Sequence, residues 1–187
     1  MRARLALILF GLAALSACST VSSWMPFSSS SASSGPPAAA CPSAVILHPL
    51  SQTAVFPPGA PRQQTSVAFY GILSQVDAKC EPAGGAVHVS LDVIVIGERG
   101  PAVGKGDSVD LQYFVAVTGA DQTILSKRSF VDRIAIPAGA KRAGITDHIE
   151  ETVPLAGRAP GDLSIVLGFQ QSPEVVEFYR HFRGRSM

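Results

Sequence analysis

The chain has 187 residues, of which 47% are hydrophobic, and it carries 15 Lys and Arg against 14 Asp and Glu. This length and apolar share predict one folded domain with an ample core and exclude a chain that is disordered throughout. A formal net charge of +1 excludes the basic footprint of nucleic-acid-binding proteins, so no nucleic acid is expected as a partner.

The N-terminus has the organisation of an export signal. Arg2 and Arg4 precede the uncharged apolar run Leu5–Leu15. A helix of this length rises only about 16 Å, roughly half of the hydrocarbon core of a bilayer. The run is therefore too short for a permanent span and has the size of the hydrophobic region of a signal peptide.

The run ends in Leu15-Ser16-Ala17-Cys18, which resembles the lipobox of bacterial lipoproteins. The resemblance implies that residues 1–17 are removed and that Cys18 is lipidated and acylated, which would hold the protein at a membrane without a transmembrane helix. Because Ser19 follows the cysteine where Asp would resemble an inner-membrane retention signal, the resemblance favours the periplasmic face of the outer membrane. The alternative is ordinary cleavage after Ala17, which would leave a free thiol.

A composition shift separates this signal from the folded part of the chain. The segment Ser19–Ala40 holds nine Ser and three Pro and no charged residue. Such a segment buries too little apolar area to offset the loss of chain entropy, so residues 18–40 are expected to form a flexible tether. The folded domain is then expected to span residues 41–187.

Three cysteines are an odd number for an exported protein. Lipidation of Cys18 leaves Cys41 and Cys80, for which a disulfide is the default in an oxidising compartment. Each is in step with apolar residues of its strand, namely Val45 and Leu47 for Cys41, and Ile72 and Val76 for Cys80. Both side chains are therefore expected to point into one core and to bond, with two buried free thiols as the alternative.

The domain shows a hydrophobic period of two, which is typical of half-buried strands. Clear alternation covers residues 87–96, 109–118 and 163–169, an apolar run covers 66–76, and weaker strands are expected at 44–47, 124–136 and 145–155. Charged residues interrupt the 124–136 segment, as in a protected edge strand. The pattern predicts a mainly β fold, an antiparallel sandwich of immunoglobulin or fibronectin type III character with about seven strands.

A short helix is predicted to close the chain. Ser172 is the expected N-cap and Pro173 the first helical residue, while Gly184 is the expected terminator. Apolar side chains recur at helical spacing, at Val175, Phe178, Tyr179 and Phe182, and are expected to dock on the sheet. A cluster of cations ends the helix, at Arg180, His181, Arg183 and Arg185. These cations either complement the helix dipole or form a candidate partner surface.

Chemistry-bearing residues form no recognisable catalytic, metal or cofactor motif. His88, Ser90 and Asp92 have the residue types of a hydrolase triad, but at this spacing they line one strand face with neighbours nearly 7 Å apart. His148 and Glu150 are two ligands without a third. The segments Tyr113–Val117 and Gly168–Gln170 are generally similar to those of uncharacterised proteobacterial envelope lipoproteins, and this resemblance implies no activity.

We therefore expect a lipid-anchored periplasmic β domain that acts as a non-catalytic structural, assembly or transport-accessory module. The expected partners are the membrane, through Cys18, and another envelope protein. The alternative is a lipid-anchored hydrolase whose site is assembled from residues distant in the sequence.

Overall fold

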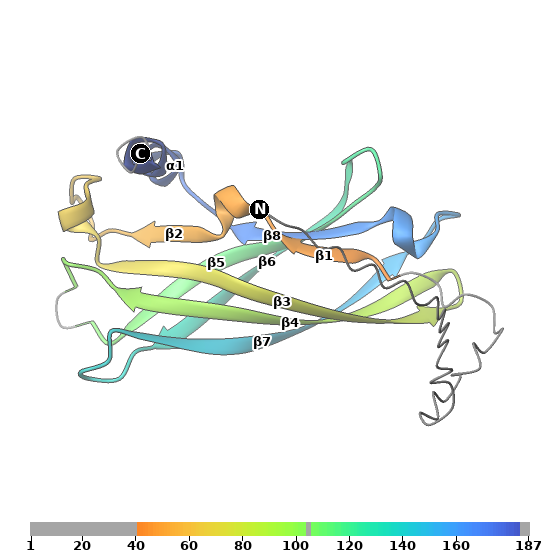
Figure 1. Cartoon of the computed structure of the whole chain (residues 1–187), viewed down its shortest axis with the longest axis horizontal. Coiled ribbons are helices and arrows are strands. Elements are labelled where there is room, and N and C mark those ends of the chain that lie inside the picture. Colours follow the sequence, from red (N-terminus) through yellow and green to blue (C-terminus); the bar gives the residue numbers. More distant parts are fainter. Residues whose placement is uncertain (1–40, 104–105, 184–187) are drawn as a thin grey trace, which may run out of the picture. The chain divides into compact units, whose positions relative to one another are not determined.

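A computed structural model describes residues 41–103 and 106–183, with side chains described as far as His181. These residues form eight strands and a C-terminal helix (Figure 1). The strands are β1 (Ser43–Ile46), β2 (Gln52–Val55), β3 (Phe69–Ala83), β4 (Ala86–Arg99), β5 (Ser108–Thr118), β6 (Ile124–Ala135), β7 (Arg142–Pro154) and β8 (Ser164–Phe169). The helix is α1 (Pro173–Arg183), and single 3₁₀ turns are η1 (His48–Leu50), η2 (Gln64–Ser66) and η3 (Pro160–Asp162).

The strands form two four-stranded sheets. The first sheet has the order β1-β8-β5-β6 and the second the order β2-β3-β4-β7. Neighbouring strands are antiparallel except for β1 and β8, which are parallel. The sheets pack face to face, which confirms the predicted mainly β sandwich with a short C-terminal helix.

The core lies between the two sheets and follows the predicted alternation. Every second residue of β4, from Val87 to Val95, is at most 1% exposed. The same holds for alternate residues around β8, from Leu163 to Phe169. Each such side chain contributes about 1.5–3 kcal/mol when it leaves water. The alternation in the sequence therefore identified the inward face of these strands correctly.

Strand β3 differs from its prediction because it contains a bulge. The β3–β4 register shifts between Leu73 and Gln75, so that Ser74 is an extra residue and the inward face changes phase. Leu73 is buried before the bulge, whereas Val76 and Cys80 pack on the core after it. Ile72 therefore lies on the opposite face from Cys80, contrary to the expectation.

The structure nevertheless contains the Cys41–Cys80 disulfide, with Cα atoms 5.8 Å apart. The expectation that Cys41 points into the core was wrong, because Cys41 is exposed. Val45, which is in step with it, is 45% exposed, while Ala44 and Ile46 pack on the core. The bond ties the start of β1 to β3, two strands that belong to different sheets.

The predicted edge strand is confirmed, because β6 ends the first sheet. On its outward face Arg133 forms a two-point ion pair with Asp110 of β5. Lys127 lies 4.3 Å above the ring of Phe114. Asp132 does not protect the edge as expected, because it belongs to the inward-facing set of β6 and is partly buried.

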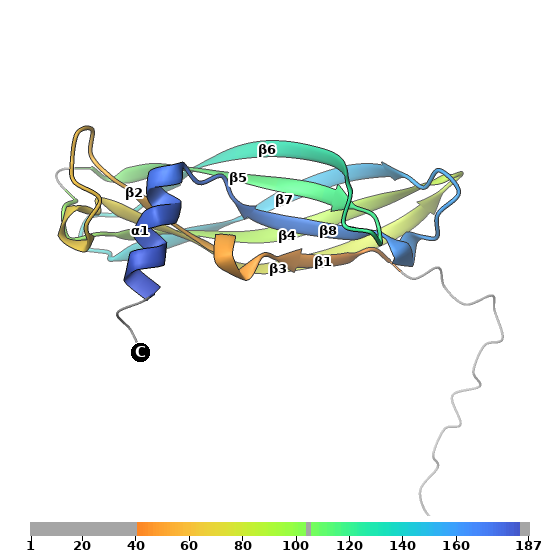
Figure 2. The same ribbon diagram turned by 90° about the horizontal axis from the view of Figure 1, so that it is seen from above.

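Helix α1 begins as predicted, with the backbone N–H groups of Val175 and Val176 donating to the carbonyl of Ser172. It crosses over β2 (Figure 2). Phe178 is buried in a second apolar cluster with Ala54 and Val67, and its ring meets that of Phe56 edge-on at 5.3 Å. The helix therefore packs on the second sheet, as expected. The predicted terminator Gly184 and the side chain of Phe182 lie outside the described residues.

Candidate functional site

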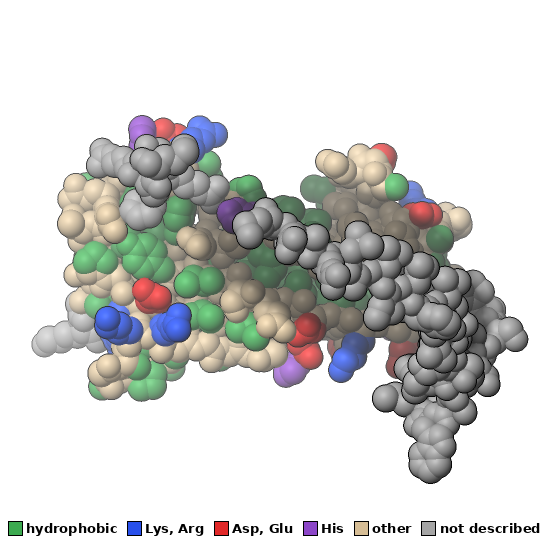
Figure 3. All heavy atoms as spheres, in the orientation of Figure 1, with side chains coloured by type: hydrophobic (Ala, Val, Ile, Leu, Met, Phe, Trp, Pro, Cys, Tyr) green, Lys and Arg blue, Asp and Glu red, His purple; other side chains and the backbone are tan. Residues whose placement is uncertain are grey.

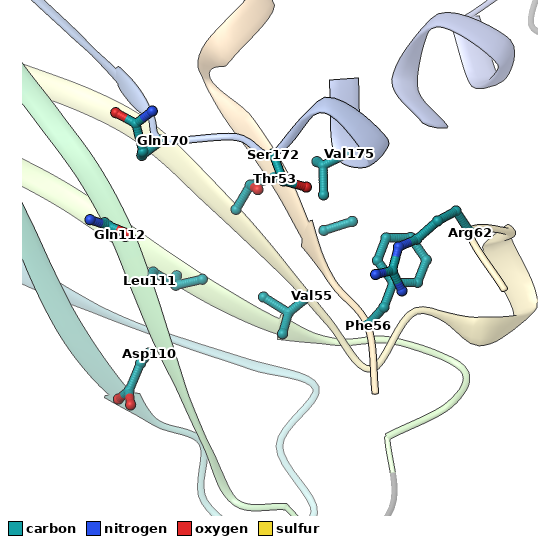
Figure 4. A pocket seen from close by; sticks show the side chains of 11 residues that line it. Thr53, Val55, Phe56, Arg62, Asp110, Leu111, Gln112, Gln170, Ser172 and Val175 are labelled. Atoms are coloured by element: carbon teal, nitrogen blue, oxygen red, sulfur yellow. The ribbon is translucent and has the colours of Figure 1, made fainter. Parts of the chain in front are cut away.

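A groove of about 280 Å³ opens between β2 and β5, beside the first turn of α1 (Figure 4). The residues that line it come from four parts of the chain: Thr53, Ala54, Val55, Phe56, Arg62, Asp110, Leu111, Gln112, Gln170, Ser172 and Val175. The side chains of Val55 and Leu111 lie across from each other at its base, and the Asp110 carboxylate points away from it (Figure 4).

The groove exists because β8 ends early. Phe169 is the last residue of β8 and pairs with Tyr113. The N–H of Gln170 then donates to the carbonyl of Gln112 at 3.0 Å, after which the chain leaves the first sheet and begins α1. Before Gln112, β5 pairs with β6 alone among the described strands. One edge of β5 is therefore open from Ser108 to Leu111.

Backbone alternation shows which groups face this open edge. The N–H of Ile136 donates to the carbonyl of Asp107 at 2.6 Å, so Asp107, Val109 and Leu111 direct their backbone groups toward β6. The backbone N–H and C=O of Asp110 therefore point the other way, toward the groove. They occupy the next position at which a strand following the line of β8 would form hydrogen bonds.

Strand β2 presents a second open edge on the other side of the groove. The N–H of Leu73 donates to Ser51 and that of Ala68 to Val55, so the backbone groups of Gln52 and Ala54 point away from β3. The side-chain amide of Gln171 donates to the Gln52 carbonyl at 2.5 Å. This contact covers one end of the β2 edge and leaves Ala54 facing the groove.

The lining is apolar at the base and mostly neutral at the rim. Arg62 lies 4.9 Å above the Phe56 ring and donates to the Ala60 carbonyl. A hydrogen bond from Ser172 and the charge of Arg62 lower the pKa of Glu174, which begins α1. The groove thus combines open backbone edges on β2 and β5 with an apolar base formed by Val55 and Leu111.

Of the site residues selected from the sequence, the structure joins Cys41 and Cys80 and describes the others only in part. Cys18 lies outside the described residues, as do Arg185 and the side chain of Arg183. Arg180 and His181 both contact Glu177 on the same helix, at 3.2 Å and 3.0 Å. This charged end of α1 is the end opposite to the groove, so the structure does not join the two surfaces.

The polar residues of β4 and β7 meet on the outward face of the second sheet. His148 Nδ1 lies 2.6 Å from Asp92 Oδ1, and Ser90 donates to Glu150 at 2.9 Å. His88 contacts Thr152 at 2.8 Å. In each pair the two residues lie directly opposite each other on β4 and β7. Ser90 is therefore hydrogen-bonded to a carboxylate and not to a histidine. These pairs could not be predicted, because local sequence patterns do not contain the β4–β7 register.

A shallow hollow lies farther along the same face. It is lined by Ile94 and Ile96 of β4 and by the 142–146 segment of β7. Hydrophobic and charged side chains lie side by side over the visible face of the molecule (Figure 3). The hollow lies over the outward faces of β4 and β7 and not between two open strand edges, so the groove between β2 and β5 is the better candidate site.

Comparisons with protein-family models, curated proteins and solved structures find no match for this chain. Within the described ranges, no three His, Cys, Asp or Glu residues converge as metal ligands. In the same ranges, no helix is long and apolar enough to cross a membrane.

Proposed function

We propose that this chain is a lipid-anchored envelope protein whose β domain binds another polypeptide through the groove between β2 and β5, without catalysing a reaction. The lipobox-like Leu15–Cys18 segment supports the anchor. The open edge of β5 supports the binding role and is the observation that carries it. The localisation, on the periplasmic face of the outer membrane, rests on the same N-terminal resemblance.

An extended segment suits this groove because its backbone can hydrogen-bond to the backbone groups at the open edge of β5. A strand beside β5 would accept from and donate to Asp110, and would continue the line on which Gln170 bonds to Gln112. Such strand addition draws affinity from main-chain hydrogen bonds and specificity from alternate side chains. Exposed strand edges are normally blocked by charge, proline or a covering element. Here the short length of β8 leaves the edge accessible.

The side chains that line the groove indicate which residues a bound segment should have. Residues of an added strand alternate between the base and the solvent. Those facing the base would meet Val55 and Leu111, and therefore should be apolar. Those facing outward would pass Gln112 and the Asp110–Arg133 ion pair, and therefore should be polar. The proposed ligand is an extended segment with alternating apolar and polar residues.

Two substitutions at one position test this proposal. Asp110→Pro removes the N–H that faces the groove, at an edge position where proline does not interrupt the β5–β6 ladder. Asp110→Ala removes the same carboxylate but keeps the N–H. We expect crosslinking in intact envelopes to capture a partner with the wild type and with Asp110→Ala, and to fail with Asp110→Pro. Equal capture by both variants, or loss in both, would contradict strand addition at β5.

A further inference from the structure

The two sheets also meet along a side of the sandwich away from the groove, where β6 ends one sheet and β7 ends the other. We call this line of contact between β6 and β7 the seam. Inward-facing side chains of the two edge strands meet there. At one position Arg128 and Glu151 form an ion pair of 2.8 Å. Four residues farther along β6 and four residues back along β7, the corresponding side chains are Asp132 and Asp147. We call these two residues the acidic pair.

The surroundings of the acidic pair are largely apolar. Tyr113 of β5 is fully buried, its ring stacks on Phe130, and its hydroxyl donates to Asp147 Oδ2. Asp132 Oδ2 is buried and has no hydrogen-bond partner among the described residues. A buried carboxylate oxygen without a donor is costly, and a second carboxylate nearby increases the cost.

Among the residues that the structure describes, neither member of the acidic pair forms an ion pair with a cation. On β6, the inward-facing cation nearest to the acidic pair is Arg128, and it forms an ion pair with Glu151 of β7. From β5, the facing group is the Tyr113 phenol, which donates to Asp147. From β4, the residue paired with Asp147 is Val93, which is fully buried and apolar. The local charge therefore depends on whether the pair holds a proton.

We propose that Asp132 keeps its proton in the folded domain, and that the loss of this proton to solvent loosens the contact between β6 and β7, so that this seam of the sandwich opens as pH rises. With the proton bound, the partly buried carboxyl group of Asp132 carries no charge, and the two edges stay together. With the proton lost, two carboxylates face each other in a largely apolar setting. This inference does not depend on the proposed binding function.

The surroundings of Asp132 shift its pKa in the direction that the proposal requires. Burial, and then the charge of Asp147, raise the pKa of Asp132 to about 6 from its ordinary value of 3.8. Because the folded-state pKa is raised, the stabilisation is complete below the unfolded-state value and is lost as pH rises through the folded-state value. The seam should therefore hold below about pH 4 and weaken progressively up to pH values just above 6.

Hydrogen–deuterium exchange of the full chain tests the inference. After correction for the intrinsic exchange rate, backbone amides of β6 should exchange about tenfold faster at about pH 7.5 than at about pH 5. About half of the pKa displacement of Asp132, roughly one unit, is expressed between these two pH values, and one unit corresponds to a tenfold change in an equilibrium. Asp132→Asn cannot ionise and should remove this pH dependence. Asp107→Asn, at an exposed position beside β5, should keep it.

Asp147→Asn provides a second variant, because its amide oxygen still accepts from Tyr113 while the like charge is gone. It should also weaken the pH dependence of β6 exchange, whether or not Asp132→Asn folds. Wild-type exchange that does not change between the two pH values would overturn the inference. So would a pH dependence that persists unchanged in either acidic-pair variant that folds, or a failure of both to fold at about pH 5, because neither variant can place two charged carboxylates at this position.

Discussion

Leu111 of β5 packs directly against the bare backbone of Gly71 in β3. A Cβ atom at Gly71 would lie 2.8 Å from Leu111 Cδ2 and 2.8 Å from Thr53 Cγ2. Leu111 and Thr53 both line the groove. Because Gly71 has no side chain, Leu111 and Thr53 can pack closely against the backbone of β3, and this packing forms part of the base of the groove.

Gly71→Ala should accordingly destabilise the domain and disturb the groove. Overpacking a well-filled core costs about 1–3 kcal/mol, because the displaced side chains leave their preferred rotamers. Thermal unfolding should show a midpoint several degrees below that of the wild type. Ser129→Ala, at an exposed position of β6, should leave the midpoint nearly unchanged. Equal midpoints for the wild type and Gly71→Ala would mean that the side chains around Gly71 are loosely packed.

Reduction of the Cys41–Cys80 disulfide should destabilise the domain by up to about 4 kcal/mol. The bond closes a loop with a sequence separation of 39, and a crosslink of this span restricts the unfolded chain. Urea unfolding with and without reductant measures the difference. Alkylation of the denatured, unreduced protein should detect no free thiol at either position. A Cys80→Ser variant that is as stable as the oxidised wild type would contradict the prediction.

The contrast between strands shows what the sequence could predict. The strict alternation of β4, β5 and β8 predicted their inward faces correctly, because one face of each is buried along its whole length. β2 was missed, since polar and apolar residues do not alternate in Gln52–Val55. Cys80 packs on the core as expected, but Ile72 was placed on the wrong face, because a one-residue bulge at Ser74 reverses the two faces of β3.

The candidate site lay beyond sequence reasoning for a related reason. The open edge of β5 depends on where β8 stops, and the last pairing of Phe169 with Tyr113 is a register that no local pattern contains. The acidic pair depends on the alignment of β6 against β7, which belong to different sheets. Local patterns identify which face of a strand is buried. They do not identify the residues that meet across sheets.

The lipid anchor is tested at Cys18. If the lipobox-like segment is processed as the resemblance implies, Cys18→Ala should abolish palmitate labelling and release the protein from the membrane fraction. Cys80→Ser should keep both the label and the membrane association, because it removes a cysteine of the folded domain. Retained labelling of Cys18→Ala would contradict the anchor and would leave the proposed interaction groove unaffected.

Phe178 is the main contact of α1 with the second apolar cluster. Phe178 is 6% exposed and packs edge-on against Phe56, a residue of the groove lining. Phe178→Ala should therefore lower the free energy of unfolding, by about 3–5 kcal/mol if the cluster cannot collapse around the cavity. Urea unfolding measures this loss.

His181→Ala is the matched control on the same helix, since His181 is exposed and contacts only Glu177 among the contacts described for it. It should change the free energy of unfolding by less than about 0.5 kcal/mol. Because Val175 and Phe56 both line the groove, Phe178→Ala should also weaken crosslinking to a partner at temperatures where the domain stays folded, whereas His181→Ala should not. If His181→Ala alone abolished crosslinking, the charged end of α1 would be the partner surface instead of the groove.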